Sequence, residues 1–380
     1  MLKISVLGIG NAGNQIANAA IREGIDAFCV NTSEKDLEAI ARDIPVYLLG
    51  NSEGAGKDRT VAKNFVKQNY RDLLRHDNFN QFIATQDIVF VVASTGGGTG
   101  SGVSIILTDI LSRVYPNKLF INIGILPTLS DSIGSQRNTL EFLKELKGME
   151  MGYMLYDNNK YKALTPAEYM EKVNKEIIDT LLYIRGDYCY RTQYGMIDDA
   201  DMYKLLTVSG MINVTSFENF FEKDMENDVT LDTYIIKNMK TNATCQIDKD
   251  RIIKRMGIIA NLSNDLTRYY DPGMEKFKSI IGEPVEVFEH YYISENSAEV
   301  PNKFAVILAG LSIPDDRIQV IIQRIVEVEA ALNKTKDSSL LDQVQSLDSL
   351  KVRSLNVDRT RSSEKVNVND LDLDFLSDRY

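Results

Sequence analysis

The sequence has little of the side-chain chemistry that disulfide frameworks and transition-metal sites need. Its 380 residues include three cysteines, Cys29, Cys189 and Cys245, without CxxC spacing, and two histidines, His76 and His290. Scattered residues of this kind predict neither a disulfide framework nor a His/Cys zinc site, because such sites need clustered ligands at short spacing. The cysteine usage is typical of a cytosolic protein.

Long apolar runs and an excess of positive charge are also absent. The longest apolar runs, such as residues 88–93 and 304–311, fall well short of the roughly 18 residues that a membrane span needs, and Met1-Leu2-Lys3 opens no signal peptide. Lys and Arg number 43 against 54 Asp and Glu, a formal net charge of −11. Because a phosphate backbone attracts positive charge, this acidic chain is not expected to bind nucleic acid directly. The short apolar runs predict no membrane contact, and we expect a cytoplasmic protein.

What is present is ordinary globular composition, 44% hydrophobic and 26% charged. At about 150 residues per domain the length suggests two domains and a remainder. From Leu2 to Tyr156 short apolar runs alternate with helical stretches, a pattern typical of a parallel, Rossmann-like α/β sheet with crossover helices. The expected strands, most of them continuously apolar as in a sheet covered on both faces, are residues 3–7, 27–31, 46–49, 88–93, 119–125 and 153–156.

A long helix follows this half of the chain. Met170, Val173, Ile177, Leu181 and Ile184 recur at helical spacing and give one apolar stripe. The spacing predicts a central helix between two domains.

The rest of the chain predicts a second, smaller α/β domain and a tail. Residues 256–262, 285–294 and 303–312 are expected strands, closed by a helix over about 315–333. From Lys336 onward apolar residues are too sparse to offset the entropy cost of ordering, so we expect disorder. The predicted units are a nucleotide-binding domain (1–165), the central helix (166–185), a connecting segment (186–225), a C-terminal α/β domain with terminal helix (226–335) and a disordered, acidic-ended tail (336–380).

The first glycine loop is Gly8-Ile9-Gly10-Asn11-Ala12-Gly13, which follows the first strand and opens a helix. This is the context that a GxGxxG motif needs to hold a diphosphate near helix N-terminal amides. NAD, FAD or a nucleotide would fit. A dinucleotide enzyme should carry Asp or Glu about 20 residues further on; the second strand ends in Asn31-Thr32 instead, which disfavours a dehydrogenase.

The second loop, Thr95-Gly96-Gly97-Gly98-Thr99-Gly100-Ser101-Gly102, is far more specific, with five glycines in eight residues. Such a cluster loses much backbone freedom on folding, and it makes most sense where side chains would clash with something docked on the main chain. Thr99 and Ser101 add hydroxyl donors beside an exposed helix N-terminus. We predict a phosphate site here.

A third loop, Glu53-Gly54-Ala55-Gly56-Lys57-Asp58, is only superficially a P-loop. GxxxxGK[ST] would require Gly at Asn51 and Ser or Thr at Asp58. What remains is a glycine turn with a cation. It would suit a terminal phosphate, and a plain surface turn is the alternative.

Residues 95–102 resemble the signature loop of the tubulin/FtsZ superfamily of GTP-binding, filament-forming proteins, written GGGTGSG or GGGTGTG. The other loops are similar to that family's in the same order: 8–14 to its first nucleotide loop, Asn31-Thr32 to its ribose-side loop, 54–56 to its γ-phosphate loop and 127–131 to its sugar loop, with Asp131 where Glu is common. The resemblance assigns the nucleotide to Gly10, Asn11, Ala12, Gly13, Asn14, Asn31, Gly54, Ala55, Gly56, Gly96, Gly97, Gly98, Thr99, Gly100, Ser101, Pro127, Asp131, Asn158 and Asn174.

Two of these residues would select the base of the nucleotide. Asn158 follows the sixth expected strand and Asn174 lies on the central helix. An asparagine carries both an acceptor and donors, so together the two can satisfy O6, N1 and N2 of guanine, an edge that adenine does not present. Tyr169 lies one place from where the family has a stacking aromatic, and Met170 takes that place.

Within the superfamily two branches are resembled. Asp157-Asn158-Asn159-Lys160, Asn174-Lys175-Glu176, residues 309–314 and the long segment from Asn174 to Asn213 are similar to TubZ, the plasmid and phage tubulins that segregate DNA. The terminal run from Asp370 to Leu376 is similar to the FtsZ terminal peptide instead.

Ser209-Gly210-Met211-Ile212-Asn213-Val214 resembles the family's catalytic loop, GxxNxDxxD in FtsZ, which completes the GTP site of the next subunit. Thr215 replaces the first acidic residue and Glu218 stands at the second. The resemblance therefore assigns catalysis to Asn213 and Glu218, with Glu222 and Asp224 as substitutes for Glu218.

The resemblance implies a GTPase that binds GTP or GDP with Mg²⁺ bridging the β- and γ-phosphates. Subunits would polymerise head to tail, and the acidic chain would move plasmid or phage DNA through a separate DNA-binding adaptor held by the tail. A cell-division or phage scaffold of the FtsZ type is the alternative, and a Rossmann-type dinucleotide enzyme a distant one. No side-chain cluster identifies a metal site made by the protein alone.

Overall fold

The computed structural model describes residues 2–50, 53–187, 195–218, 230–248, 253–264, 266, 274–294 and 302–337. Cys189, Glu222, Asp224 and the predicted tail beyond residue 337 lie outside these ranges. Residues 1–322 form one compact unit and residues 323–380 a second. Of the second unit the structure describes the end of one helix, and the account below concerns the first.

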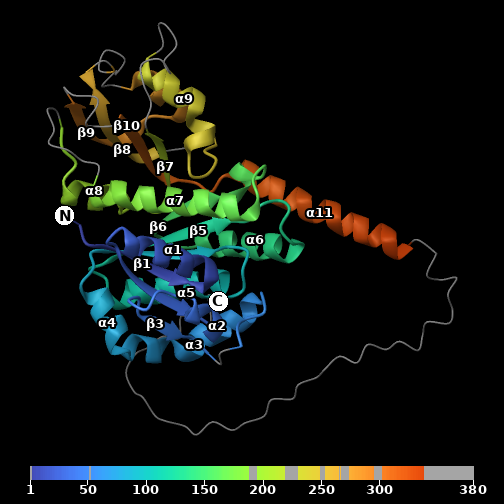
Figure 1. Cartoon of the computed structure of the whole chain (residues 1–380). Coiled ribbons are helices and arrows are strands. Elements are labelled where there is room, and N and C mark those ends of the chain that lie inside the picture. Colours follow the sequence, from blue (N-terminus) through green and yellow to red (C-terminus); the bar gives the residue numbers. More distant parts are fainter. Residues whose placement is uncertain are drawn as a thin grey trace, which may run out of the picture. The chain divides into compact units, whose positions relative to one another are not determined.

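The first half of the chain is the parallel α/β sheet that the sequence predicts (Figure 1). All six expected strands form, each within two residues of its predicted bounds. Hydrogen bonding places them in the order β3-β2-β1-β4-β5-β6, all parallel. Their bounds are β1 (Ile4–Ile9), β2 (Asp26–Asn31), β3 (Val46–Leu48), β4 (Ile88–Ser94), β5 (Leu119–Leu126) and β6 (Gly152–Asp157).

Helices cover both faces of this sheet, which explains the continuous burial of its central strands. Helix α1 packs on β1, β2 and β4 and contacts α7; α5 packs on β4 and β5 and contacts α3 and α6. The helices of this half are α1 (Gly10–Arg22), α2 (Glu34–Glu38), α3 (Arg59–Arg75), α4 (Asp77–Ala84), α5 (Thr99–Val114), α6 (Ile133–Lys147), the 3₁₀ turn η1 (Asn158–Tyr161) and the predicted central helix α7 (Pro166–Arg185).

The second half continues the same sheet rather than starting a new one. Strand β7 (Gly210–Glu218) pairs in parallel with β6 and antiparallel with β10 (Lys303–Leu311), and the sheet goes on through β8 (Ile253–Ser263) to β9 (Pro284–Ser294). The three strands predicted here are confirmed. The remaining helices are α8 (Asp199–Leu206), α9 (Leu231–Asn242), α10 (Glu275–Ile281) and α11 (Asp315–Asp337), the last at the predicted terminal helix.

Residues 210–218 are a strand where the sequence analysis expected the catalytic loop. The expectation of a loop was wrong because Met211, Ile212 and Val214 are almost completely buried between β6 and β10. A backbone buried at that depth needs hydrogen-bond partners on both sides. Strand β10 pairs with residues 211–218 of β7, β6 pairs with residues 210–212, and the Thr244 N–H donates to the Val214 carbonyl.

Two further expectations concern composition. Of the described residues, Cys29 and Cys245 are free, buried cysteines. Among the described helices, none has the length and apolar character that crossing a bilayer requires.

Candidate functional site

Two helix N-termini meet at the carboxyl edge of the sheet. Strands β1 and β4 are neighbours, and their following helices start at Gly10 and Thr99. A Cβ built on Gly10 would lie 3.0 Å from the backbone nitrogen of Gly100, so the two helix ends are in contact. Strands β2 and β3 are added on one side of β1, and β4, β5 and β6 on the other, so the strand order reverses between β1 and β4. At such a point a crevice opens at the carboxyl ends of the two parallel strands.

Neither of these two helices is capped by a side chain. The N-cap residues are Ile9 for α1 and Gly98 for α5, and neither makes a side-chain cap bond among the described residues. In the same half α2 is capped by Ser33, α3 by Asp58 and α6 by Ser132, whereas α4, which follows His76, has no side-chain cap bond either. The first N–H groups of a helix need acceptors and carry partial positive charge. The joint of α1 and α5 is therefore built for an anion.

The glycines around this joint fall into two kinds. A Cβ on Gly13 would lie 2.1 Å from the carbonyl oxygen of Val92, and a Cβ on Gly98 would lie 2.8 Å from the Lys57 backbone. Packing within the protein requires these two. A Cβ on Gly97 would meet nothing within 4 Å. The protein itself gives no steric reason for a glycine at that position, whereas a ligand lying on the main chain does.

Hydrogen bonds join the loop at residues 54–57 to the glycine-rich loop through the end of β2. The Gly54 N–H donates to the Thr32 carbonyl at 2.8 Å, and the hydroxyls of Thr32 and Thr99 are 2.6 Å apart. Gly54, Gly56 and the non-glycine Lys57 have positive φ angles of 80°, 57° and 64°. The three predicted phosphate loops therefore lie together at one edge of the sheet.

The side chains of Asn14 and Asn31 form hydrogen bonds with the backbone of these loops. With its amide oriented to suit its neighbours, Asn14 donates to the carbonyls of Gly8 and Gly10 and accepts from Asn31 Nδ2 at 3.1 Å. Asn31 Oδ1 accepts from the N–H of Thr32 at 2.8 Å. Both side chains are almost fully buried, so they hold the loop backbones and direct few polar atoms outward.

The Ser101 hydroxyl is turned into the protein, whereas the sequence analysis expected it to donate to phosphate. Ser101 is fully buried; its Oγ accepts from Arg59 Nε at 3.2 Å and donates to the Gly97 carbonyl. The buried guanidinium of Arg59 needs acceptors, and it takes this one. What Ser101 offers a ligand is its backbone N–H at the start of α5.

At the other end of the crevice the structure brings η1 and α7 together. Glu176 of α7 accepts from Lys160 Nζ at 2.9 Å and from the Tyr161 hydroxyl. These contacts place η1, which carries Asn158, beside the turn of α7 that carries Asn174. The side-chain oxygen of Asn158 is buried and has no partner among the described residues.

The loop at residues 127–131 is tied to this end. Asn159 Oδ1 accepts from the Leu129 N–H at 3.2 Å, and Arg317 donates to both the Pro127 carbonyl and Asp157, each at 2.7 Å. The Asp131 carboxylate turns into its own loop and accepts from the N–H and hydroxyl of Thr128.

Tyr169 is almost fully buried, while Met170, the residue at the position of the family's stacking aromatic, is 45% exposed. Burial and the Asp131 carboxylate raise the pKa of Tyr169, so its hydroxyl stays protonated at neutral pH.

The two candidate catalytic residues lie apart from these loops in strand β7. Asn213 is fully buried and its Nδ2 donates to the Cys245 carbonyl at 2.7 Å. Glu218 ends the strand, where its Oε1 lies 3.3 Å from both Lys303 Nζ and the Tyr183 hydroxyl, with 24% of its side chain exposed. In this conformation Glu218 can be reached from outside the protein, and Asn213 cannot.

Three residues of the site were missed in the sequence. Arg59 and Asn138 contact the phosphate loops, and Arg317 ties together the loops at the other end. Arg317 lies 160 residues from Asp157 in the chain, and no local pattern marks any of the three. Within the described ranges no group of His, Cys, Asp and Glu has the arrangement of a metal site.

Comparison with known proteins adds three kinds of likeness. Residues 3–166 match the sequence model of a family described as "Tubulin/FtsZ family, GTPase domain". The tubulin-like protein TubZ of Clostridium botulinum C phage is 28% identical over 301 residues, 77% of each chain. The tubulin-like protein CetZ of Pyrococcus abyssi is 26% identical over 189 residues, and the match spans about half of that protein, 52%.

Solved structures share the fold. The crystal structure of TubZ from Clostridium botulinum phage c-st has a TM-score of 0.67 at 22% identity, with 86% of this chain and 97% of that one covered. CetZ2 from Haloferax volcanii, in a GTPγS-bound protofilament, has a TM-score of 0.70 at 19% identity, with 88% and 100% covered. At such identities these two likenesses establish the fold alone.

Proposed function

Residues 3–166 of this chain are a GTPase domain of the tubulin/FtsZ family, and from that premise we propose that the protein is a filament-forming GTPase of the TubZ kind. The observation that carries the proposal is the joint of two uncapped helix N-termini, with Gly97 open above it. Backbone N–H groups of helix ends hold phosphate by partial charge and by hydrogen bonds together.

GTP would lie along the crevice with its phosphates on the helix joint. The amides of Gly10, Asn11, Ala12 and Gly13 and of residues 96–101 would bind the α- and β-phosphates, and the loop at 54–56 would contact the γ-phosphate. Pro127 and Asp131 would line the sugar, and Asn158 and Asn174 would read guanine. The unpaired Asn158 Oδ1 supports this end of the assignment, because a buried acceptor without a partner is costly.

Magnesium would supply charge neutralisation between the β- and γ-phosphates. The described residues offer no cluster of carboxylates for it. The ion would therefore be held largely by phosphate oxygens and water, as is usual for Mg²⁺.

Hydrolysis would be completed between subunits. Phosphoryl transfer asks a protein mainly for positioning and charge stabilisation, and in this protein Glu218 of the next subunit would orient the attacking water. A head-to-tail contact joins two different surfaces, so it extends into a filament rather than closing into a dimer. The protofilament of CetZ2 supports this arrangement by analogy.

The filament would move plasmid or phage DNA through an adaptor. A net charge of −11 opposes direct contact with DNA, so a separate basic protein would join the filament to its cargo. The similarity to phage TubZ supports this role over cell division. The sequence of residues 370–376 supports the FtsZ-like alternative.

Filament formation tests the proposal directly. We expect the full chain to sediment as filaments with GTP or GTPγS and to stay in the supernatant with GDP or ATP. Because the active site needs two subunits, GTP turnover per molecule should rise with protein concentration above a threshold. Turnover per molecule that is independent of concentration, or GTP that is not bound at all, would contradict the proposal.

A further inference from the structure

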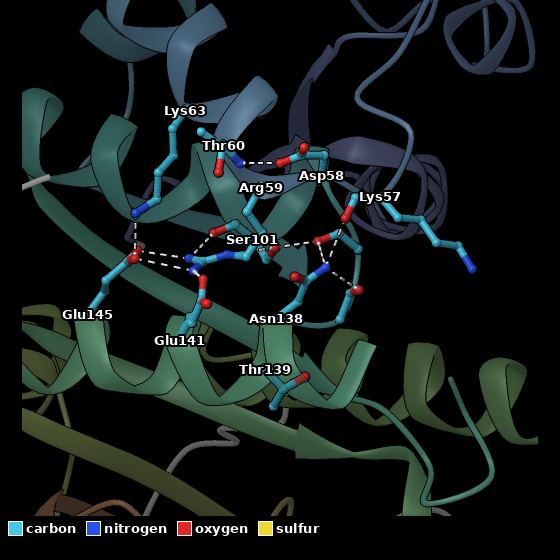
Figure 2. A network of polar contacts seen from close by, with 12 residues as sticks. Lys57, Asp58, Arg59, Thr60, Lys63, Ser101, Asn138, Thr139, Glu141 and Glu145 are labelled. Atoms are coloured by element: carbon cyan, nitrogen blue, oxygen red, sulfur yellow. Dashed lines mark hydrogen bonds and ion pairs between the residues drawn. The ribbon is translucent and has the colours of Figure 1, made fainter. Parts of the chain in front are cut away.

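One face of helix α6 meets the two phosphate loops. Asn138, Glu141 and Glu145 are spaced i, i+3 and i+7, so they share a face, and Figure 2 shows all three directed at the N-terminal ends of α3 and α5. Each makes a contact with a different part of this region. The resemblance assigned no role to any of them.

Asn138 lies at the seam between the loops (Figure 2). Its Nδ2 lies 3.1 Å from the Lys57 carbonyl, 3.1 Å from the Gly96 carbonyl and 3.4 Å from the Gly97 carbonyl. One amide group thus donates to the loop at 54–57 and to the glycine-rich loop at once. The side chain is half-buried, and water screens these bonds only in part.

These bonds determine which way the glycine amides point. In a trans peptide the C=O of one residue and the N–H of the next point in opposite directions. Turning the Gly96 and Gly97 carbonyls toward Asn138 therefore turns the N–H groups of Gly97 and Gly98 away from it. Neither N–H donates to a backbone carbonyl in the part of the chain that the structure describes.

The opposite side of the seam is held in an unfavourable conformation. Lys57 has a φ of 64°, which L-residues other than glycine adopt at a cost. Its backbone packs on Gly98 so closely that a Cβ there would lie 2.8 Å away. The Asn138 bond to the Lys57 carbonyl offsets part of that cost and keeps the two loops in register.

Helix α6 itself is fixed by a buried arginine. Arg59, 3% exposed, donates to Glu141 at 2.9 Å, to Glu145 at 2.8 Å and to the Ser101 carbonyl at 2.9 Å, which joins α6 to α3 and α5. A buried guanidinium with several charge-assisted bonds holds its partners in one geometry. The bonds of Arg59 thus hold the helix that carries Asn138 beside the two phosphate loops.

We propose that Asn138 is a positioning residue that aims the Gly97 and Gly98 amides at the nucleotide and couples them to the loop at 54–57, so that it favours triphosphate over diphosphate. This inference rests on the proposed function, since it takes the loop at 54–57 as the contact for the γ-phosphate. GDP would lack that contact and would depend less on the coupling.

The test compares GTPγS and GDP affinities of the full chain for four variants, measured with fluorescent nucleotides. Asn138→Ala removes the donor, and Asn138→Asp replaces it with a group that repels the three carbonyls. We expect GTPγS to bind at least tenfold more weakly and GDP less than threefold more weakly. Asn138→Gln, which keeps the amide, should restore part of the difference. Lys144→Ala, an exposed change on the same helix, should change neither affinity.

Equal losses for both nucleotides, or no loss, would overturn the inference, as would a wild-type chain that binds the two equally. Circular dichroism and thermal unfolding show whether the variants fold; failure of both Asn138→Ala and Asn138→Asp to fold would assign the residue to stability and overturn the inference too. Wild-type protein that binds no guanine nucleotide would instead refute the proposed function.

Discussion

Alanine at Gly97 is expected to leave the fold intact and to lower the affinity for GTP at least a hundredfold. The added Cβ would meet nothing within 4 Å in the protein, and Gly97 is not among the glycines with positive φ. The free energy of unfolding without nucleotide should stay the same or rise by about 0.4–1 kcal/mol, because alanine has less freedom in the unfolded chain. If phosphate lies on this main chain, the methyl group takes its place.

A hundredfold loss corresponds to about 2.7 kcal/mol, on the scale of one or two hydrogen bonds to a charged group. The matched control is Gly186→Ala, where a Cβ also meets nothing within 4 Å but φ is 90°. That change should lower stability by about 1 kcal/mol through backbone strain and leave GTP affinity unchanged. Calorimetric titration and thermal unfolding measure both quantities. A Gly97→Ala protein that binds GTP as tightly as wild type would show that the loop does not hold phosphate.

The Glu218→Ala substitution is expected to lower GTP turnover tenfold or more while GTP binding stays intact. Filaments should still form and should persist, because hydrolysis no longer follows assembly. The stability cost should exceed the roughly 1 kcal/mol of an exposed ion pair, because only 12% of the Lys303 side chain and 24% of the Glu218 side chain are exposed. Phosphate release and sedimentation, followed in the same sample, separate turnover from assembly.

Glu286→Ala serves as the control for this second change. Glu286 is also a partly exposed carboxylate in ion pairs, with Lys204 and Arg255, on strand β9. Its loss should affect stability at most and leave turnover unchanged. Wild-type turnover in the Glu218→Ala protein would remove Glu218 from the mechanism. Asn213→Ala offers no such test, because it removes a buried hydrogen bond to the Cys245 carbonyl and would lower the stability of the fold itself.

The sequence predicted those parts of the fold that depend on local pattern. Each strand of the first half is a short apolar run, and each of the two glycine loops that follow β1 and β4 opens a helix. Strand β7 was missed because its pairing is not local. Phe304 lies opposite Phe217, and this pairing partner is more than 80 residues away in the chain.

The same reason explains the residues of the site that were missed or misjudged. Arg59, Asn138 and Arg317 act through contacts between helices and loops that no spacing in the sequence encodes. Ser101 was expected to turn its hydroxyl to phosphate, but the buried Arg59 beside it claims that oxygen. Side-chain direction depended on a neighbour 42 residues away in the chain.

The central claim is that amides at the joined ends of α1 and α5 hold the phosphates of GTP. Amide hydrogen exchange of the full chain, with and without saturating GTPγS, tests it most directly. The account predicts that protection of the backbone amides from exchange rises together at residues 10–14 and 96–101. Protection at the N-terminal ends of the other helices should change little. Tight binding of GTPγS with exchange at both segments unchanged would contradict it.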